Sequence, residues 1–422
     1  MFLGWRIVAL AFLTNFVSVG FVFYSYGVFF KALQAEFGGS RLGVSVGLTC
    51  MQLTTAAAAP AVGKLLDAGR ARAVMTVGAL LMASGFVLAS TIAELWQFYA
   101  IFGLLMGVGV CMLGGVSSST LVANWFIGRR GTALGLATMG ISMSGVVMPP
   151  LGTLLIENLG FRSTFLVYAA IALGLLAPAT YFLVVDRPES VGLRPDGLPA
   201  DCNDAAAAAG PRVPEPLDTR TILASRNFWV IASVIALNFG CMSAILTHAV
   251  PHAIDAGFSP TKAAFVLSAM AGAGSLGKPV FGAITDRLDK RTGMWVASAF
   301  QIVGIWQLLH AVGYVELLMA GAVFGFGMGG IVPLQGALVG AAFGRHGFGR
   351  VMGLLAPAMV PINMLGVPLS GYIFDHSGSY TLAFQIFIGV LALSMVVLSL
   401  LRLPETEPGQ AAATAPGESL AT

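Results

Sequence analysis

The chain has 422 residues, of which 57% are hydrophobic and only 10% are charged, and its formal net charge is +3. A soluble domain carries about 25% charged residues, so this composition excludes a soluble globular protein and indicates an integral membrane protein. The four cysteines have neither paired nor metal-ligand spacing, and neither a phosphate-binding loop nor a nucleophile–base pair is visible. The sequence therefore predicts a protein that is not an enzyme and that has no metal and no cofactor.

Apolar runs long enough for a transmembrane helix, about 20 residues, recur along the whole chain. Strands of a membrane barrel are shorter and alternate in polarity, so we expect an all-α membrane protein. The twelve predicted spans cover residues 7–29, 42–65, 73–92, 96–123, 131–156, 163–185, 228–254, 262–285, 293–312, 315–341, 350–373 and 381–402.

One polar interruption divides the spans into two groups of six. Residues 186–227 are rich in Pro, Asp and Arg and contain no run of apolar residues that could cross a membrane. They are predicted to link an N-terminal six-helix half, residues 1–185, to a C-terminal six-helix half, residues 228–403. The remaining residues, 404–422, have a similar composition and are predicted to form a disordered tail.

The distribution of Lys and Arg predicts the orientation. With the N-terminus in the cytoplasm, 17 of the 22 Lys and Arg residues fall on the cytoplasmic side, four fall on the other side, and one lies inside a span. Basic residues are enriched on the cytoplasmic side of membrane proteins. We therefore expect a multi-pass protein of the cell membrane with both termini, the linker and the tail in the cytoplasm.

The two halves contain matching segments. One set of matching positions repeats at an offset of 219 residues and consists of Gly63, Asp67 and Arg72 in the first half and Gly282, Asp286 and Arg291 in the second. A further match pairs Arg130 with Arg350 at an offset of 220. The matches predict a duplicated six-span unit, and repeats of this kind place a substrate site near the midplane between the halves.

Lys278 is the one charged residue that cannot be placed at the end of a predicted span. A charge at membrane depth is costly and is rarely kept without a use, although a lysine can also extend its ammonium to the membrane surface. Ser275 lies on the same helix face, one turn earlier. A lone cation in a neutral interior predicts a partner from outside, a small anion, with Lys278 and Ser275 as binding residues.

Two residues are candidates for proton coupling. Desolvation disfavours the charged form of a lysine and an arriving carboxylate restores it, so Lys278 itself is the first candidate. His248, near the outer end of the seventh predicted span, is the second, because histidine titrates near neutrality. A structural, hydrogen-bonded role for His248 is the alternative.

Neutral polar residues inside the spans are further candidates to bind a carboxylate. Tyr26, Asn124 and Asn363 are predicted to belong to the substrate site. The alternative for each is a hydrogen bond between helices, which is worth about 0.6 kcal/mol in a membrane protein.

The segment from Gly63 to Arg72 resembles the signature loop of the major facilitator superfamily, in which Gly is followed after three residues by Asp and then by basic residues. Together with twelve spans and a central linker, this resemblance implies the major facilitator fold, with twelve transmembrane helices in two pseudo-symmetric six-helix halves. It also implies that acidic residues at the cytoplasmic span ends cap neighbouring helices and hold that side closed. The gating residues that follow from it are Asp67, Arg72, Arg130, Asp286, Arg291 and Arg350.

A narrower likeness concerns the segments from Tyr26 to Lys31 and from Asn124 to Phe126, which resemble the monocarboxylate transporters and the related oxalate/formate group. In those families a basic residue on the eighth span engages the substrate carboxylate and precedes Pro-x-x-Gly, and Lys278 to Gly282 is similar to that pattern. The oxalate type has a second cation on span eleven. None is present between Val351 and Phe374, which argues against a dianion.

We therefore predict a secondary active transporter of a small organic anion, in the first place a monocarboxylate. It would work by alternating access, with proton symport or anion exchange, as a monomeric transport unit in the lipid bilayer and without nucleic acid. An exporter of neutral or hydrophobic molecules is the alternative, but it would not need Lys278. A membrane sensor would need a larger cytoplasmic domain than the linker and tail provide.

Overall fold

The computed structural model describes most of the chain at the level of individual residues. The described residues are 2–26, 29, 33, 36–37, 41–197, 218–345 and 347–403, without the side chains of 41–46, 260, 261 and 264. The predicted tail, part of the predicted linker and Lys31 lie outside the described residues.

The described part of the N-terminal half is helical. Its elements are α1 (Leu3–Val19), η1 (Gly20–Tyr24), α3 (Arg41–Asp67), α4 (Ala71–Ser90), α5 (Leu95–Ala100), η2 (Ile101–Met106), α6 (Gly107–Leu113), α7 (Gly115–Trp125), α8 (Arg130–Ile171), η3 (Ala172–Leu176) and α9 (Ala177–Leu183).

The described parts of the linker and of the C-terminal half are helical or irregular. Their elements are η4 (Pro188–Val191), η5 (Pro195–Gly197), α10 (Thr219–Ala224), α11 (Arg226–Asp255), α12 (Pro260–Arg287), α13 (Lys290–His310), α14 (Tyr314–Phe343), α15 (Phe348–Asn363), α16 (Gly366–Ser377) and α17 (Thr381–Ser399).

Within the described residues, nine helical segments are long and apolar enough to cross a membrane. One of these, Arg130–Leu183, has 54 residues and contains a break at Gly160, whose φ of 79° is not helical, so it makes two spans. The less apolar helices α3 and α12 bring the total to twelve and confirm the predicted all-α fold. Both are rich in Ala, Gly, Ser and Thr because they pack against the other half rather than against lipid.

Several spans are not straight. The fourth predicted span is broken at Gly114, with φ −84° and ψ −143°, between α6 and α7. The eleventh is broken between α15, which ends at Asn363, and α16, which begins at Gly366. Gly114 has no side chain that would restrict its backbone at the first break. Pro368 has no N–H group to bond to the carbonyl of Met364, so the helix is interrupted at the second break.

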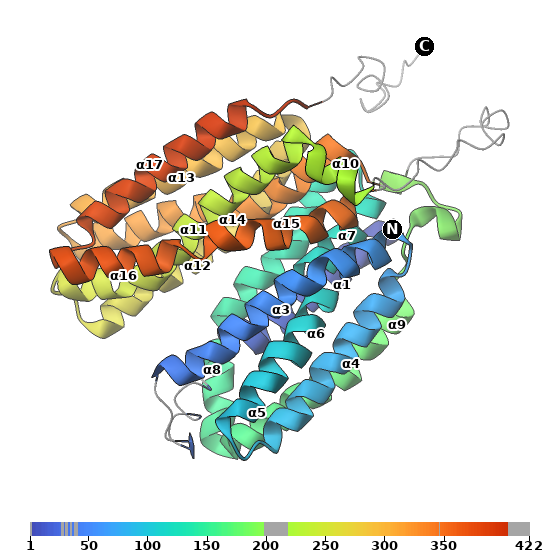
Figure 1. Cartoon of the computed structure of the whole chain (residues 1–422), viewed down its shortest axis with the longest axis horizontal. Helices are drawn as coiled ribbons and strands as arrows, with labels where there is room; N and C mark the ends of the chain where they lie inside the picture. The colour runs from blue at the N-terminus through green and yellow to red at the C-terminus, as the bar shows by residue number, and fades with distance from the viewer. Residues whose placement is uncertain are drawn as a thin grey trace, which may run out of the picture.

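Each half has its own apolar core. The halves meet along four central helices, where α8 packs against α12 and α3 packs against α15. One core contains residues 7–184, and two further cores lie almost wholly within residues 222–401. Figure 1 shows the two groups of helices converging toward the side at which the N-terminus and α10 lie and diverging at the opposite side. We call these the linker end and the far end of the molecule.

Candidate functional site

Lys278 lies at the crossing of α12 with α8, between the two halves. Its side chain is 5% exposed, and its ammonium donates a hydrogen bond of 2.5 Å to the hydroxyl of Ser142 on α8. The ion pairs of the described residues do not include Lys278. The ammonium is therefore buried and held across the interface by a neutral hydroxyl, and it does not extend to the surface. Its role in a transport pathway stays a prediction.

Ser275, one turn before Lys278 on α12, adds a second polar group to the same place. Its hydroxyl is buried and has no hydrogen-bond partner among the described residues. Pro279 has no N–H group, so the carbonyl of Ser275 also loses the partner that it would have in a regular helix. Buried polar groups without partners are rare, and a donor beside a cation suits a carboxylate.

Glycines allow α8 and α12 to approach closely at the level of Lys278. A Cβ atom added to Gly135 would lie 2.5 Å from the Lys278 carbonyl oxygen and 3.0 Å from the Cα of Pro279. A Cβ added to Gly282 would lie 2.9 Å from the carbonyl carbon of Gly131. No side chain fits in these places, so the backbones of the two halves touch from Lys278 to the linker end.

Asp286 closes the same crossing at its linker end. Its Oδ1 accepts a hydrogen bond of 2.6 Å from the N–H of Gly131, and its Oδ2 accepts one of 2.8 Å from the N–H of Thr132. These N–H groups belong to the first turn of α8 and have no partner within their own helix. A carboxylate from the C-terminal half thus caps a helix of the N-terminal half.

Asp67 makes the corresponding contact between α3 and α15. Its Oδ1 and Oδ2 accept hydrogen bonds of 2.9 and 2.8 Å from the N–H groups of Gly349 and Arg350. The carbonyl of Asp67 also accepts a bond of 2.9 Å from Arg187 of the linker. The capping that the sequence predicts is present at both crossings, while a gating role for the six predicted residues stays a prediction.

Burial controls the protonation of both capping carboxyls, which lie beyond the predicted ends of their spans. Burial raises the pKa of Asp67 to about 6, although the N–H bonds from Arg350 and Gly349 act in the opposite direction. Burial also raises the pKa of Asp286 above its usual range, against the bonds from Thr132 and Gly131.

The capping geometry corrects the predicted correspondence of the two arginines. Gly131 and Gly349 occupy the same place in the two caps, which sets the offset between α8 and α15 at 218 rather than 220. Arg130 therefore corresponds to Phe348, over whose ring its guanidinium lies at 6.0 Å. Arg130 donates hydrogen bonds to the carbonyls of Phe126 and Ala123.

Arg72 and Arg291 hold each half together instead of joining the halves. Arg72 donates 2.9 Å to the carbonyl of Val184, where α9 ends. Arg291 donates 3.4 Å to the carbonyl of Leu401 and pairs with Asp289. Within the described residues, these contacts of each side chain stay inside one half. Neither contact joins the two halves as a latch would.

Two of the predicted substrate residues make contacts with the N-terminal half and the start of the linker. The ring of Tyr26 packs at 5.9 and 5.8 Å from those of Phe98 and Phe102, inside the N-terminal half. The amide of Asn124 donates 3.3 Å to the carbonyl of Asp186, and so joins α7 to the linker. Both side chains stabilise the N-terminal half, which agrees with the structural alternative considered for them.

His248 and Asn363 are placed in the C-terminal half. His248 contacts the carbonyl of Val367 at 3.2 Å and the hydroxyl of Tyr380 at 3.3 Å, so it joins α11 to α16 and α17. A carbonyl only accepts, so Nε2 carries a proton. Asn363 ends α15 at the break of that span, beside Gly240 of α11.

Two residues close to Lys278 are missing from the sequence-based site. Ser142 is not among the predicted residues, because a serine in an apolar span is common and only the crossing shows that it faces the ammonium. Tyr24 lies against Gly145, one turn beyond Ser142 on α8, where an added Cβ would be 2.7 Å from its ring. A neutral polar side chain inside the first predicted span, residues 7–29, was the available signal.

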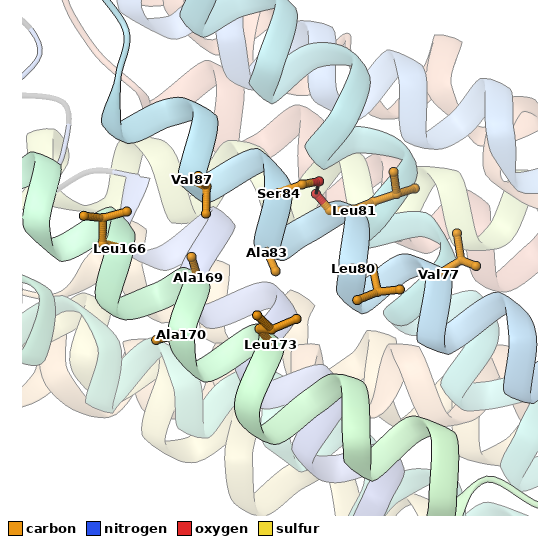
Figure 2. Close-up of a pocket in the computed structure, with 10 residues that line it drawn as sticks. All are labelled: Val77, Leu80, Leu81, Ala83, Ser84, Val87, Leu166, Ala169, Ala170 and Leu173. Carbon is orange, nitrogen blue, oxygen red and sulfur yellow. Dashed lines mark hydrogen bonds between the residues drawn. The ribbon is translucent and has the colours of Figure 1, made fainter.

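Two further features of the described residues do not indicate a functional site. Within the described part of the chain, no group of three or more His, Cys, Asp or Glu residues could hold a metal ion. A groove of about 650 Å³ lies between α4 and the segment formed by the end of α8 and η3. Figure 2 shows Leu80 and Val87 from α4 and Leu166 and Leu173 from that segment along it. Its lining is almost entirely apolar, as expected for a surface that faces lipid.

Comparisons with known proteins agree with this architecture. The model of the family described as Major Facilitator Superfamily matches residues 11–359. Monocarboxylate transporter 11 of Homo sapiens is 30% identical over 411 residues, which are 93% of this chain and 81% of that protein. Monocarboxylate transporter 13 of Rattus norvegicus is 27% identical over 390 residues, which are 91% of this chain and 85% of that protein.

A solved structure shows the same fold at low sequence identity. The proton:xylose symporter XylE, bound to 6-bromo-6-deoxy-D-glucose, superposes with a TM-score of 0.75 and 13% identity. The superposition covers 95% of this chain and 96% of that chain.

Proposed function

Because the chain belongs to the major facilitator superfamily and is a membrane transporter related to the monocarboxylate transporters, we propose that it carries a small monocarboxylate across the membrane. The observation that carries this proposal is Lys278, a buried ammonium between the two halves that contacts a hydroxyl and no carboxylate among the described residues. An incoming carboxylate supplies the missing negative charge.

The substrate carboxylate would bind to Lys278 and to the hydroxyl of Ser275. The ammonium has three N–H groups, and Ser142 accepts one of them. A carboxylate would take the place of this hydroxyl, and the N–H groups of the ammonium and the Ser275 hydroxyl would then be donors for its two oxygens. An ion pair formed away from water is strong, because a buried charge without a partner is costly.

Transport would follow from the alternation of the two halves about this site. The caps made by Asp67 and Asp286 and the glycine contacts between the halves close the linker end. Toward the far end the two groups of helices diverge (Figure 1). The anion therefore enters from the far end in this state, and it leaves after the caps open.

Two coupling modes are compatible with a site built around Lys278. In proton symport, the lysine takes up a proton as the carboxylate binds and releases it with the substrate. In anion exchange, the lysine stays charged and a second anion replaces the first. His248 would take part in symport as a relay, from its place at the contacts of α11 with α16 and α17.

The orientation that we propose places the linker end in the cytoplasm and the protein in the cell membrane as a monomeric transport unit. The excess of Lys and Arg at the linker end supports this orientation. In that orientation the structure faces outward.

The test is uptake of labelled lactate, pyruvate, acetate, formate and oxalate into proteoliposomes, with and without an inward proton gradient. Lys278→Gln removes the charge and should abolish uptake of every monocarboxylate. Lys262→Gln is the matched control, because Lys262 lies on the same helix but is exposed and sits over the Tyr314 ring at 5.3 Å. It should transport like the wild type.

Uptake that depends on the gradient identifies proton symport, and uptake that depends on an internal anion identifies exchange. Uptake of an acid that is unaffected by Lys278→Gln would contradict the proposed site. No uptake of any acid, combined with extrusion of a neutral apolar compound, would instead establish the alternative function of an exporter.

A further inference from the structure

The two crossings between the halves are copies of one another in backbone geometry. A Cβ atom added to Gly135 would lie 3.0 Å from the Cα of Pro279, and one added to Gly353 would lie 3.2 Å from the Cα of Pro60. The closest atom in each case is the carbonyl oxygen of the residue before the proline, Lys278 or Ala59.

The agreement continues toward the linker end. A Cβ added to Gly282 would lie 2.9 Å from the carbonyl carbon of Gly131, and one added to Gly63 would lie 2.9 Å from that of Gly349. The capping carboxylates occupy matching places as well. The residues of α3 and α12 therefore correspond at an offset of 219, and those of α8 and α15 at an offset of 218.

These offsets assign a counterpart to each member of the charged contact. Lys278 corresponds to Ala59, because 278 − 219 = 59, and both are followed by Pro-x-x-Gly-x-x-x-Asp. Ser142 corresponds to Val360, because 142 + 218 = 360. One crossing thus presents an ammonium and a hydroxyl, while its copy presents a methyl group and an isopropyl group. Ala59 is fully buried, and Val360 is half-buried.

We propose that Ala59 and Val360 are specificity-determining residues that make this a transporter of acids with one charged end. This inference rests on the proposed function. The carboxylate binds at the crossing of α8 with α12, and the uncharged end of the same molecule lies at the crossing of α3 with α15. A second carboxylate at that end would meet methyl groups in place of an ammonium and would lose its water without replacement.

The charge asymmetry also predicts how the specificity can be changed. Ala59→Lys places an ammonium at the position that the backbone symmetry makes equivalent to Lys278. Such a protein presents one cation at each crossing and should accept an acid with a carboxylate at both ends. Val360→Ser places the counterpart of the Ser142 hydroxyl there and should admit a second carboxylate to a smaller extent.

The experiment compares butyrate with succinate, which have four carbons each and differ by one carboxylate. Uptake of both is measured in proteoliposomes for the wild type, Ala59→Lys, Ala59→Met and Val360→Ser. Ala59→Met is the matched control, because its side chain is long but uncharged. Folding of every variant is checked by its elution in size exclusion and by its thermal unfolding in detergent.

We expect the wild type to prefer butyrate, and we expect Ala59→Lys to raise the ratio of succinate to butyrate uptake at least tenfold. Ala59→Met should lower both rates without a change in this ratio, and Val360→Ser should raise the ratio several-fold. If Ala59→Lys does not fold, the ratio in Val360→Ser decides the question alone.

An unchanged ratio in folded Ala59→Lys and in Val360→Ser would overturn the proposal, and so would equal effects of Ala59→Lys and Ala59→Met. Failure of the underlying function looks different, because the wild type would then take up neither butyrate nor any other monocarboxylate.

Discussion

At the scale of single residues, the contact between Lys278 and Ser142 links the charge of the ammonium to the arrangement of the two halves. A cation from one half is held by a hydroxyl from the other, at a distance of 2.5 Å. A neutral hydroxyl compensates a buried charge less well than a carboxylate does. If the proposed carboxylate replaces the hydroxyl, the ammonium gains a stronger partner, which would favour binding of the anion.

Ser142→Ala tests whether the hydroxyl competes with the substrate for the ammonium. A charge-assisted hydrogen bond contributes about 1.5–3 kcal/mol. If this bond forms only in the protein without substrate, Ser142→Ala should lower the Kd for the anion by about tenfold or more, because about 1.4 kcal/mol corresponds to a factor of ten. Calorimetric titration with the transported acid measures this change.

Ser144→Ala is the matched control on the same helix, because the hydroxyl of Ser144 bonds to the carbonyl of Ile141 at 2.7 Å. Its Kd should equal that of the wild type. A weaker affinity in Ser142→Ala would show instead that the hydroxyl stays on the ammonium, or contacts the anion, in the complex.

The interior position of Lys278 could be predicted from the sequence, whereas most of the residues around it could not. A charge inside an apolar span has few stable placements, so its residue type alone indicates the interior. Tyr26 and Asn124 have no such restriction, since a neutral polar side chain can bond to any nearby carbonyl. In the structure Asn124 bonds to the linker, and Tyr26 packs against two phenylalanines.

At the scale of helices, the closed linker end depends on backbone contacts that leave no room for side chains. Gly282→Ala should weaken these contacts, because the new Cβ would lie 2.9 Å from the carbonyl carbon of Gly131 and closer still to its oxygen. Overpacking of a tight contact costs about 1–3 kcal/mol. We expect a lower Tm in detergent and a larger population that is open at the linker end.

Gly389→Ala is the control for this substitution. Gly389 lies in α17, and an added Cβ would have no neighbouring atom within 4 Å. Alanine is a better helix former than glycine by about 1 kcal/mol, so the Tm should stay the same or rise. Equal losses of Tm in both variants would show that the crossing is not specially tight.

The cap made by Asp67 predicts a pH dependence of the closed linker end. Its pKa is about 6 in this arrangement and has its ordinary value of 3.8 when the carboxyl is hydrated. A proton therefore binds more tightly to the closed form. Lowering the pH from 7 to 5 should favour that form by up to about tenfold, and the gain is lost as the pH rises through 6.

Labelling of a cysteine introduced at the linker end with an impermeant maleimide measures the open population at each pH. Asp67→Asn resembles the protonated form and should remove the contribution of Asp67, leaving that of Asp286. Asp67→Asn with Asp286→Asn should remove both. A pH dependence that survives in the double variant would assign it to other groups.

The positions of the helices could be predicted better than which residues of one half are equivalent to which residues of the other. Length and polarity locate a span because the membrane requires them. The match of Arg130 with Arg350 was wrong by two residues, because charged side chains at a helix end can be placed in several ways. Glycines such as Gly135 and Gly353 define the true offset, since only they allow the backbone contact.

At the scale of the whole molecule, the beginning of the linker is folded onto the linker end and touches both halves. Asp196 accepts hydrogen bonds of 3.0 and 2.8 Å from the N–H groups of Ile127 and Gly128 in the N-terminal half. Glu189 pairs with Arg345 of the C-terminal half. Composition predicted a linker here, but these contacts depend on loops brought together by the fold and could not be predicted.

The pair of Glu189 with Arg345 should act as an additional tie that must break when the linker end opens. The two side chains are 43% and 21% exposed, and an exposed ion pair contributes at most about 1 kcal/mol. Glu189→Gln should therefore raise the open population, measured by maleimide labelling at the linker end, by up to about fivefold. High salt should have the same effect on the wild type, because salt screens exposed charges.

Glu36→Gln is the matched control, because Glu36 pairs with Arg162 at 3.0 Å with similar exposure but inside the N-terminal half. It removes an ion pair without removing a tie between the halves, so labelling should not change. Exchange of the charges, Glu189→Arg with Arg345→Glu, should restore the wild-type value. Equal labelling in Glu189→Gln and the wild type would show that the caps of Asp67 and Asp286 close the linker end without help from the linker.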